Sequence, residues 1–199
     1  DLLTLFGLPI CWNEDNQISA DQIDIYIKDE TVDYMHGTDN ALAIKREGID
    51  EFNQMAGKEM FAYVRDGDVY QVDVKGNAET VFYPRESDGS YIGVNRTQSS
   101  FVRLYLTDRK IDHVVFTTAT TGVMIPLDQA LPAEKTLGGF FWAIDERPLK
   151  PSDIFLHPER TKRPEKTITS ATAEEEEDEE EEDSPKKNRR RRNTNQTNR

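Results

Sequence analysis

The sequence predicts an all-β protein, folded as a stacked-rung β-jellyroll and followed by a disordered, charged C-terminal tail. Three segments alternate apolar and polar residues with a period of two, which is typical of half-buried strands. A polar turn and a return strand follow each of them, and the pattern recurs after 37 and then 42 residues. Such units suggest propeller blades or stacked rungs, and three are too few to close a propeller.

The repeat can be followed residue by residue. The first strands of the three units are residues 23–27, 60–64 and 102–106. The turns contain Asp29, Asp66 and Asp108, of which the Asp66-Gly67 pair is the strongest hairpin signal. The return strands begin at Val32, Val69 and Ile111, and the next apolar residue follows at an odd step of three, which predicts a β-bulge. Third strand pieces are expected at residues 41–44, 80–83 and 123–127.

The remaining segments give weaker signals. In 48–58, Ile49, Phe52 and Met55 lie at steps of three, which indicates one or two helical turns or a loop with buried anchors. We expect a short helix in 128–135 and a final strand in 138–144, and we expect 2–12 to supply the last strands of an earlier rung. Prolines beyond residue 147 predict that the folded domain comprises residues 1–157 and the tail residues 158–199.

The tail carries an acidic run at 174–183 and a basic run at 186–192, and these two runs contain no apolar residues to support ordered packing. The whole chain has a net charge of −13; the part after Ala173 holds 10 acidic and 7 basic residues, which leaves 28 acidic and 18 basic residues, about −10, in the rest. A body of this charge repels phosphates, so we expect no nucleic-acid partner. No apolar run is long enough for a transmembrane span. From the missing initiating Met we expect either a piece of a larger protein, its C-terminal part, or a processed form.

The inventory of catalytic side chains is thin. A single cysteine excludes an internal disulfide, and the three histidines (36, 113 and 157) are scattered. A two-histidine metal site is one interpretation of His36 and His113, and ordinary surface histidines are the favoured one. Metalloprotease, hydrolase-elbow and phosphate-loop motifs do not occur in the sequence. We therefore predict that the chain is not an enzyme and needs no cofactor and no metal.

The feature that remains is an apolar stripe on one face of the three first strands. Its nine members are Ile23, Ile25, Ile27, Met60, Ala62, Val64, Val102, Leu104 and Leu106. They either pack the interior of a closed β-sandwich or line an open trough for acyl chains, and the residue pattern by itself favours the closed interior. On the opposite face, Tyr26, Tyr63 and Tyr105 occupy equivalent positions and predict a cross-strand aromatic ladder.

Several ordered pieces resemble the OstA-like proteins of the Bacteroidetes, which are related to the periplasmic LptA component of lipopolysaccharide transport. They are Gly7-Leu-Pro-Ile-Cys-Trp12, Gln17-Ile-Ser-Ala-Asp21, Gly76-Asn-Ala78, Ile92-Gly-Val-Asn-Arg96 with Ser99-Ser100, and Gly139-Phe-Phe-Trp142 with Arg147-Pro148. The resemblance covers most of residues 1–157.

The resemblance implies a jellyroll of folded-over rungs that shields lipid acyl chains on the way to the outer membrane, with the nine stripe residues as candidate groove lining. It also implies a periplasmic location, with the outer membrane as a site of association. The implied partners are lipopolysaccharide or a related lipid, and other jellyroll transport proteins or further copies of the chain, joined end to end through edge strands.

Two other classes of function stay open. A structural or assembly module of the cell envelope would share the fold but have a packed, ligand-free interior. An enzyme would need paired carboxylates or a histidine–metal cluster within one cavity, and it ranks third.

Overall fold

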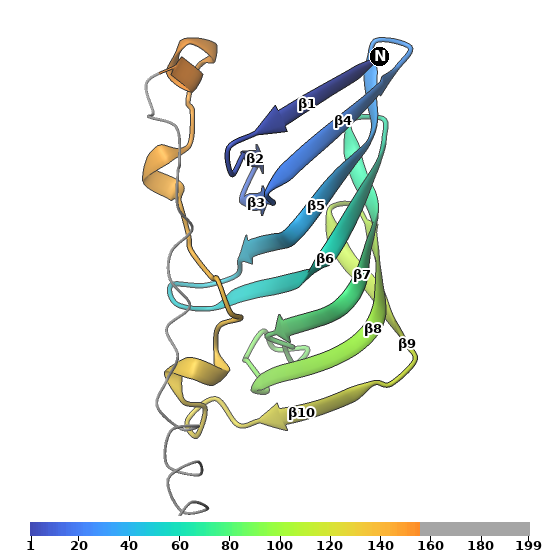
Figure 1. The fold of residues 1–199 in the computed structure, drawn as a ribbon. Coiled ribbons are helices and arrows are strands. Elements are labelled where there is room, and N and C mark those ends of the chain that lie inside the picture. The colour runs from blue at the N-terminus through green and yellow to red at the C-terminus, as the bar shows by residue number, and fades with distance from the viewer. Residues whose placement is uncertain (156–199) are drawn as a thin grey trace, which may run out of the picture. The chain divides into compact units, whose positions relative to one another are not determined.

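The computed structural model describes residues 1–155 and confirms the all-β prediction (Figure 1). Ten antiparallel strands form one sheet, in which most strands pair with their neighbours in sequence. The strands are β1 (Leu2–Phe6), β2 (Ile10–Asn13), β3 (Asn16–Ser19), β4 (Gln22–Lys28), β5 (Thr31–Arg46), β6 (Phe52–Arg65), β7 (Asp68–Phe82), β8 (Val94–Thr107), β9 (Lys110–Thr117) and β10 (Thr121–Ile125). Three short 3-10 helices follow at Pro132–Glu134, Ile144–Glu146 and Pro151–Phe155. The predicted disordered tail lies outside the described residues.

The sheet is folded over on itself into two walls. Strands β5 to β8 are 14 to 16 residues long and cross the fold line. Their register shifts lie side by side there, and the backbone has positive φ at Asp39 and Asn40 of β5 and at Gly76 and Asn77 of β7. Such a row of bulges bends a sheet sharply. The first wall contains β1, β4, β9 and residues 31–38, 59–65, 68–75 and 101–107; the second contains β2, β3, β10 and residues 41–46, 52–57, 78–82 and 94–99.

The three predicted hairpins are confirmed as β4–β5, β6–β7 and β8–β9. Both residues of each turn have positive φ, as a type I′ turn requires; the pairs are Asp29-Glu30, Asp66-Gly67 and Asp108-Arg109. Each return strand also carries the predicted bulge, because the register shift leaves one residue without an opposite partner; these residues are Asp33, Tyr70 and Asp112. The first wall is therefore a true internal repeat.

Two apolar clusters stabilise the folded sheet. One lies between the walls, where Ile23, Met60, Val74 and Val102 are at most 1% exposed. The other lies on the outer face of the second wall, where Leu42, Ile44, Val81, Tyr83 and Val94 are covered by side chains from residues 127–142.

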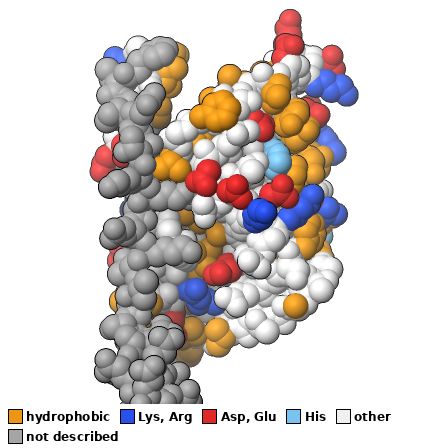
Figure 2. Space-filling view, in the orientation of Figure 1, with side chains coloured by type: hydrophobic (Ala, Val, Ile, Leu, Met, Phe, Trp, Pro, Cys, Tyr) orange, Lys and Arg blue, Asp and Glu red, His pale blue; other side chains and the backbone are white. Residues whose placement is uncertain are grey.

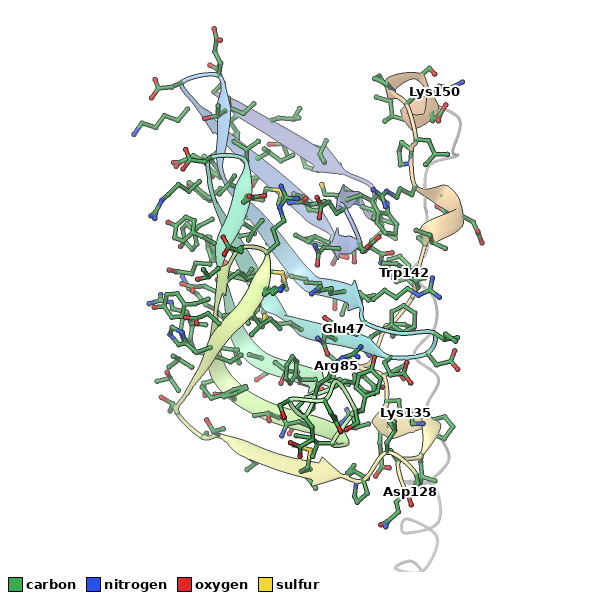
Figure 3. The ribbon with its side chains drawn as sticks, turned by 180° about the vertical axis from the view of Figure 1, so that it is seen from behind. Glu47, Arg85, Asp128, Lys135, Trp142 and Lys150 are labelled. Carbon is green, nitrogen blue, oxygen red and sulfur yellow. The ribbon has the colours of Figure 1, made fainter. Side chains whose placement is uncertain are left out.

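The segment that covers this second cluster, residues 126–147, is called the strap, and Figure 3 shows it running from Asp128 past Lys135 to Trp142 across the strand ends. Two buried glutamines hold its backbone. The Gln54 amide donates to the Lys135 carbonyl (2.8 Å) and accepts from the Leu137 N–H (2.7 Å). Gln17 makes the same pair of bonds with Phe141 and Ala143, both at 2.8 Å. Each side-chain amide thus replaces one rung of a β-ladder.

Two local predictions are wrong for related reasons. Residues 52–58 belong to strand β6 and not to a helix. The period-two pattern of apolar residues is not visible in this part of the sequence, because two of its buried positions hold the polar residues Asn53 and Gln54, which are hydrogen-bonded. Residues 138–144 do not form a strand, because the Gln17 side chain and not a neighbouring backbone binds them. The helix expected in 128–135 is reduced to one 3-10 turn.

Candidate functional site

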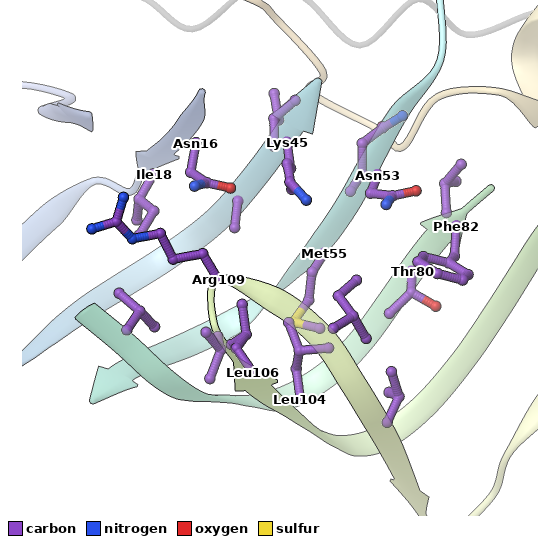
Figure 4. A pocket seen from close by; sticks show the side chains of 18 of the residues that line it. Asn16, Ile18, Lys45, Asn53, Met55, Thr80, Phe82, Leu104, Leu106 and Arg109 are labelled. Carbon is purple, nitrogen blue, oxygen red and sulfur yellow. The ribbon is translucent and has the colours of Figure 1, made fainter. Parts of the chain in front are cut away.

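A cavity of about 200 Å³ lies between the two walls, on the side away from the fold line (Figure 4). Its apolar lining comes from both walls of the folded sheet. The first wall contributes Val69, Val72, Leu104, Leu106, Ile111, Val114 and Phe116. The second wall contributes Ile18, Ala43 and Met55. Because aliphatic and aromatic side chains from six strands converge here, the cavity suits an apolar group of a ligand.

The lining of the second wall changes from apolar to polar toward the mouth. Strand register places Ile18, Ala43, Met55 and Thr80 side by side in an inner row. Two residues further along each strand, an outer row consists of Asn16, Lys45, Asn53, Phe82 and Asn95. The cavity is therefore amphipathic, with an apolar interior and a polar rim.

Most polar groups of the rim are already occupied. Glu47 accepts hydrogen bonds from Asn53 (3.0 Å) and from the Lys45 ammonium group (2.9 Å), and Asn53 accepts from the Tyr83 N–H (2.9 Å). The Thr80 hydroxyl differs from these groups. It is buried, with 5% of the residue exposed, and it has no hydrogen-bond partner among the described residues.

Arg109 spans the mouth of the groove. This residue lies in the β8–β9 turn of the first wall, and its guanidinium group bonds Glu14 in the β2–β3 turn of the second wall. It also donates to Asp68 at 2.7 Å. All three side chains are about half exposed, so solvent screens these ion pairs and they hold the mouth only weakly.

A second hollow of about 660 Å³ adjoins the cavity and shares Asn13, Ile18 and Val69 with it. Its lining is more polar, and it lies between the β4–β5 and β6–β7 turns and strand β2. Cys11 lines it too, and burial raises the pKa of the Cys11 thiol to about 11. The two hollows form one groove along the open edge of the folded sheet.

The structure separates the nine stripe residues by depth. Leu104 and Leu106 line the cavity, and Val64 lines the second hollow. Nearer the fold line, the stripe is packed core: Ile23, Met60, Ala62 and Val102 are buried, and Ile25 packs against them. Ile27 is partly buried and lines neither hollow.

Sequence reasoning missed the return strands as groove lining. Val69, Val72, Ile111 and Val114 line the cavity, although the repeat alignment already placed them in equivalent positions. A search for the same alternation in the return strands would have found them.

The outer face of the first wall carries the aromatic ladder. Tyr26 stacks on Tyr34 with ring centroids 4.2 Å apart, and Tyr34 lies 5.9 Å from Tyr63. Tyr105 stacks instead on His113, at 4.4 Å. Acidic, basic and hydrophobic side chains and a histidine lie close together on the surface in Figure 2. Cross-strand packing accounts for the ladder.

The same face contains a buried ion pair. Asp73 is 2% exposed and accepts two bonds from Arg103, at 2.7 and 2.6 Å. The carboxylate and the hydrogen bonds raise the pKa of Arg103 above its ordinary value. Asp73 is therefore a structural residue.

Within residues 1–155, no group of three or more His, Cys, Asp or Glu side chains is arranged to hold a metal ion. The same part of the chain contains no helix with the length and apolar character of a membrane span. Comparisons with family models, curated proteins and solved structures find no match to this chain.

Proposed function

We propose that this protein is a periplasmic lipid-binding and bridging protein, which shields acyl chains of lipopolysaccharide or a related lipid in its groove during transport to the outer membrane. The observation that carries the proposal is the apolar cavity between the walls, which adjoins the open edge of the folded sheet. The resemblance of the ordered sequence pieces to OstA-like proteins supports the same function.

The size of the cavity sets the strength of binding. An apolar cavity of about 150 Å³ accommodates benzene, so about 200 Å³ accommodates on the order of eight carbon atoms of one chain. At about 0.8 kcal/mol per buried methylene, that segment contributes about 6 kcal/mol before the losses of association are subtracted. This corresponds to weak binding, which suits a carrier that must release its ligand.

The bridging part of the proposal rests on the ends of the sheet. β1 pairs only with β4 and β2 only with β3, while β9 and β10 each pair only with β8. Each end of the groove thus presents two edge strands. Leu3 and Phe6 of β1 and Val123 and Met124 of β10 are between 47% and 73% exposed. Exposed apolar edge strands are able to pair with a further jellyroll unit.

Photo-crosslinking tests lipid binding. A benzoylphenylalanine introduced at Phe116, which lines the cavity, is expected to form an adduct with lipopolysaccharide upon illumination. The matched control is Phe101, a residue of the same type on the paired strand, where Arg103 lies over its ring on the outer face. Adducts at position 116 and not at 101 support the groove.

Equal labelling at both positions, or none at 116, would contradict the proposal. The second result would favour the structural module of the cell envelope, for which the closely packed interior around Ile23 and Val102 is the specific evidence.

Sedimentation velocity tests end-to-end association. We expect the full chain to form concentration-dependent oligomers, and Val123→Lys to shift them toward the monomer, because a lysine on an edge strand opposes pairing. The control is Ile49→Lys, a residue that is also exposed (80%) but lies between β5 and β6, outside the edge strands, and this variant should keep the wild-type oligomers. A wild-type chain that stays monomeric at all concentrations would rule out self-bridging.

A further inference from the structure

The Thr80 hydroxyl is the one feature of the groove that core packing does not explain. We infer that the groove binds an acyl ester, with one acyl chain in the cavity and the ester oxygen bonded to the Thr80 hydroxyl. This inference rests on the proposed function and names the chemical class of its ligand.

The position of Thr80 places this bond inside the groove and not at its rim. Thr80 lies in the inner row opposite Met55, and the outer row begins two residues further along β7 at Phe82. Two strand residues span about 7 Å, so Thr80 meets a ligand group about 7 Å inside the rim. In an acyl ester the carbonyl lies between the acyl chain and the head group. A ligand with its chain in the cavity and its head group at the rim therefore brings this carbonyl to the depth of Thr80.

The chemistry of the neighbouring threonine shows the contrast. Thr97 pairs with Thr80 across β7 and β8 and is buried to a similar extent, at 7% exposed, but its hydroxyl donates to Asn95 at 2.9 Å. Buried hydroxyl groups are normally bonded in this way, because an unbonded one loses its interaction with water. Thr80 lines the cavity, its buried hydroxyl has no such partner among the described residues, and a ligand carbonyl would accept its proton.

The charges around the mouth favour an uncharged head group. Two basic residues, Lys45 and Arg109, and two acidic residues, Glu14 and Asp68, line the cavity, so their charges balance. The ion pairs described above already engage both basic groups. An uncharged head group, such as a polyol, leaves these ion pairs in place.

Competition against a fluorescent apolar probe tests the inference. N-phenyl-1-naphthylamine bound to the full chain is displaced either by 1-monodecanoylglycerol or by 1,2-tetradecanediol, which replaces the ester with two methylenes. We expect Thr80→Val to lower the ratio of ester to diol affinity by about 3- to 10-fold, the contribution of one hydrogen bond. Comparing ratios cancels the greater hydrophobicity of the diol.

Two further variants act as controls. Thr80→Ser keeps the hydroxyl and should keep the wild-type ratio, and Thr97→Val removes the neighbouring, bonded hydroxyl and should also leave the ratio unchanged. Valine has the shape of threonine, so Thr80→Val should unfold at the same or a higher urea concentration than the wild type.

The outcomes separate lipid binding by the groove from the role of Thr80. Failure of both compounds to displace the probe from the wild type would refute lipid binding itself. Displacement by both, with the same affinity ratio in wild type and Thr80→Val, would leave the lipid groove in place and overturn the role of Thr80.

Discussion

Replacing Gln54 by glutamate tests how the strap is held. The substitution keeps the shape of the side chain but removes the N–H donor that bonds the carbonyls of Phe52 (3.0 Å) and Lys135 (2.8 Å). At pH 7 a buried carboxylate then faces two carbonyl oxygens. Two lost bonds at about 1 kcal/mol each, together with the buried charge, predict that Gln54→Glu lowers the free energy of unfolding by about 3 kcal/mol.

The same variant should respond to pH with a definite sign. Burial and the two carbonyls raise the pKa of the introduced carboxyl group above its unfolded value of about 4.3. The part of the penalty that depends on ionisation is therefore absent below about pH 4 and grows as pH rises; it is about 2 kcal/mol, or about 1.5 pKa units, while the remaining lost bond, about 1 kcal/mol, is missing at every pH. Protonation restores a donor toward the Lys135 carbonyl.

Urea unfolding at pH 7 and pH 5 measures both effects. Gln98→Glu is the control, because Gln98 lies on β8 on the same face of the sheet as Gln54 but is exposed. The control should change stability by less than about 0.5 kcal/mol. A Gln54→Glu variant as stable as the wild type at pH 7 would show that the amide donor does not hold the strap.

Three further predictions follow from the described contacts. Burial raises the pKa of Tyr83 to about 12, whereas its pKa in the unfolded chain is about 10. The free energy of unfolding should therefore be unchanged below pH 10 and fall by up to about 3 kcal/mol as pH rises to 12, and alkaline unfolding of Tyr83→Phe should show a smaller fall. Arg103→Ala should lower the free energy of unfolding by about 3 kcal/mol, because it leaves the Asp73 carboxylate buried without a partner. Asp73→Ala should cost less, because the guanidinium group that it leaves behind is partly exposed to water, and equal losses in urea unfolding would contradict this. Glu30→Gly should raise the free energy of unfolding by about 1 kcal/mol, because Glu30 has φ +62° in its turn and glycine adopts this conformation without strain. A lower free energy of unfolding in urea for this variant would refute the assignment of backbone strain.

The hairpins could be predicted from sequence because their signals are local. A turn such as Asp66-Gly67 and the strands beside it lie within a few residues of one another, and even the bulges at Asp33 and Asp112 appear as an odd step in the apolar pattern. The strap could not be predicted, because its partners are distant. Gln54 bonds residues 81 and 83 positions away, and no local pattern marks a glutamine as buried.

The candidate site was predicted only in part. Alternation identifies the inner face of a strand, but it does not tell where along that face packing ends and a cavity begins. Met60 and Leu104 belong to the same stripe, yet Met60 lies in the packed core and Leu104 lines the cavity. The difference is their distance from the fold line, which the backbone corners at residues 39–40 and 76–77 determine.

The continuity of β5 to β8 through the fold line also has a mechanical consequence. Since each of these strands belongs to both walls, the walls cannot separate like two hinged domains; widening the groove requires four neighbouring backbones to flex together. The folded sheet is therefore stiff at the fold line and yields most easily at the far ends of the walls, where the exposed Arg109–Glu14 ion pair joins them. An elongated guest would then exchange by sliding lengthwise, with little deformation of the sheet.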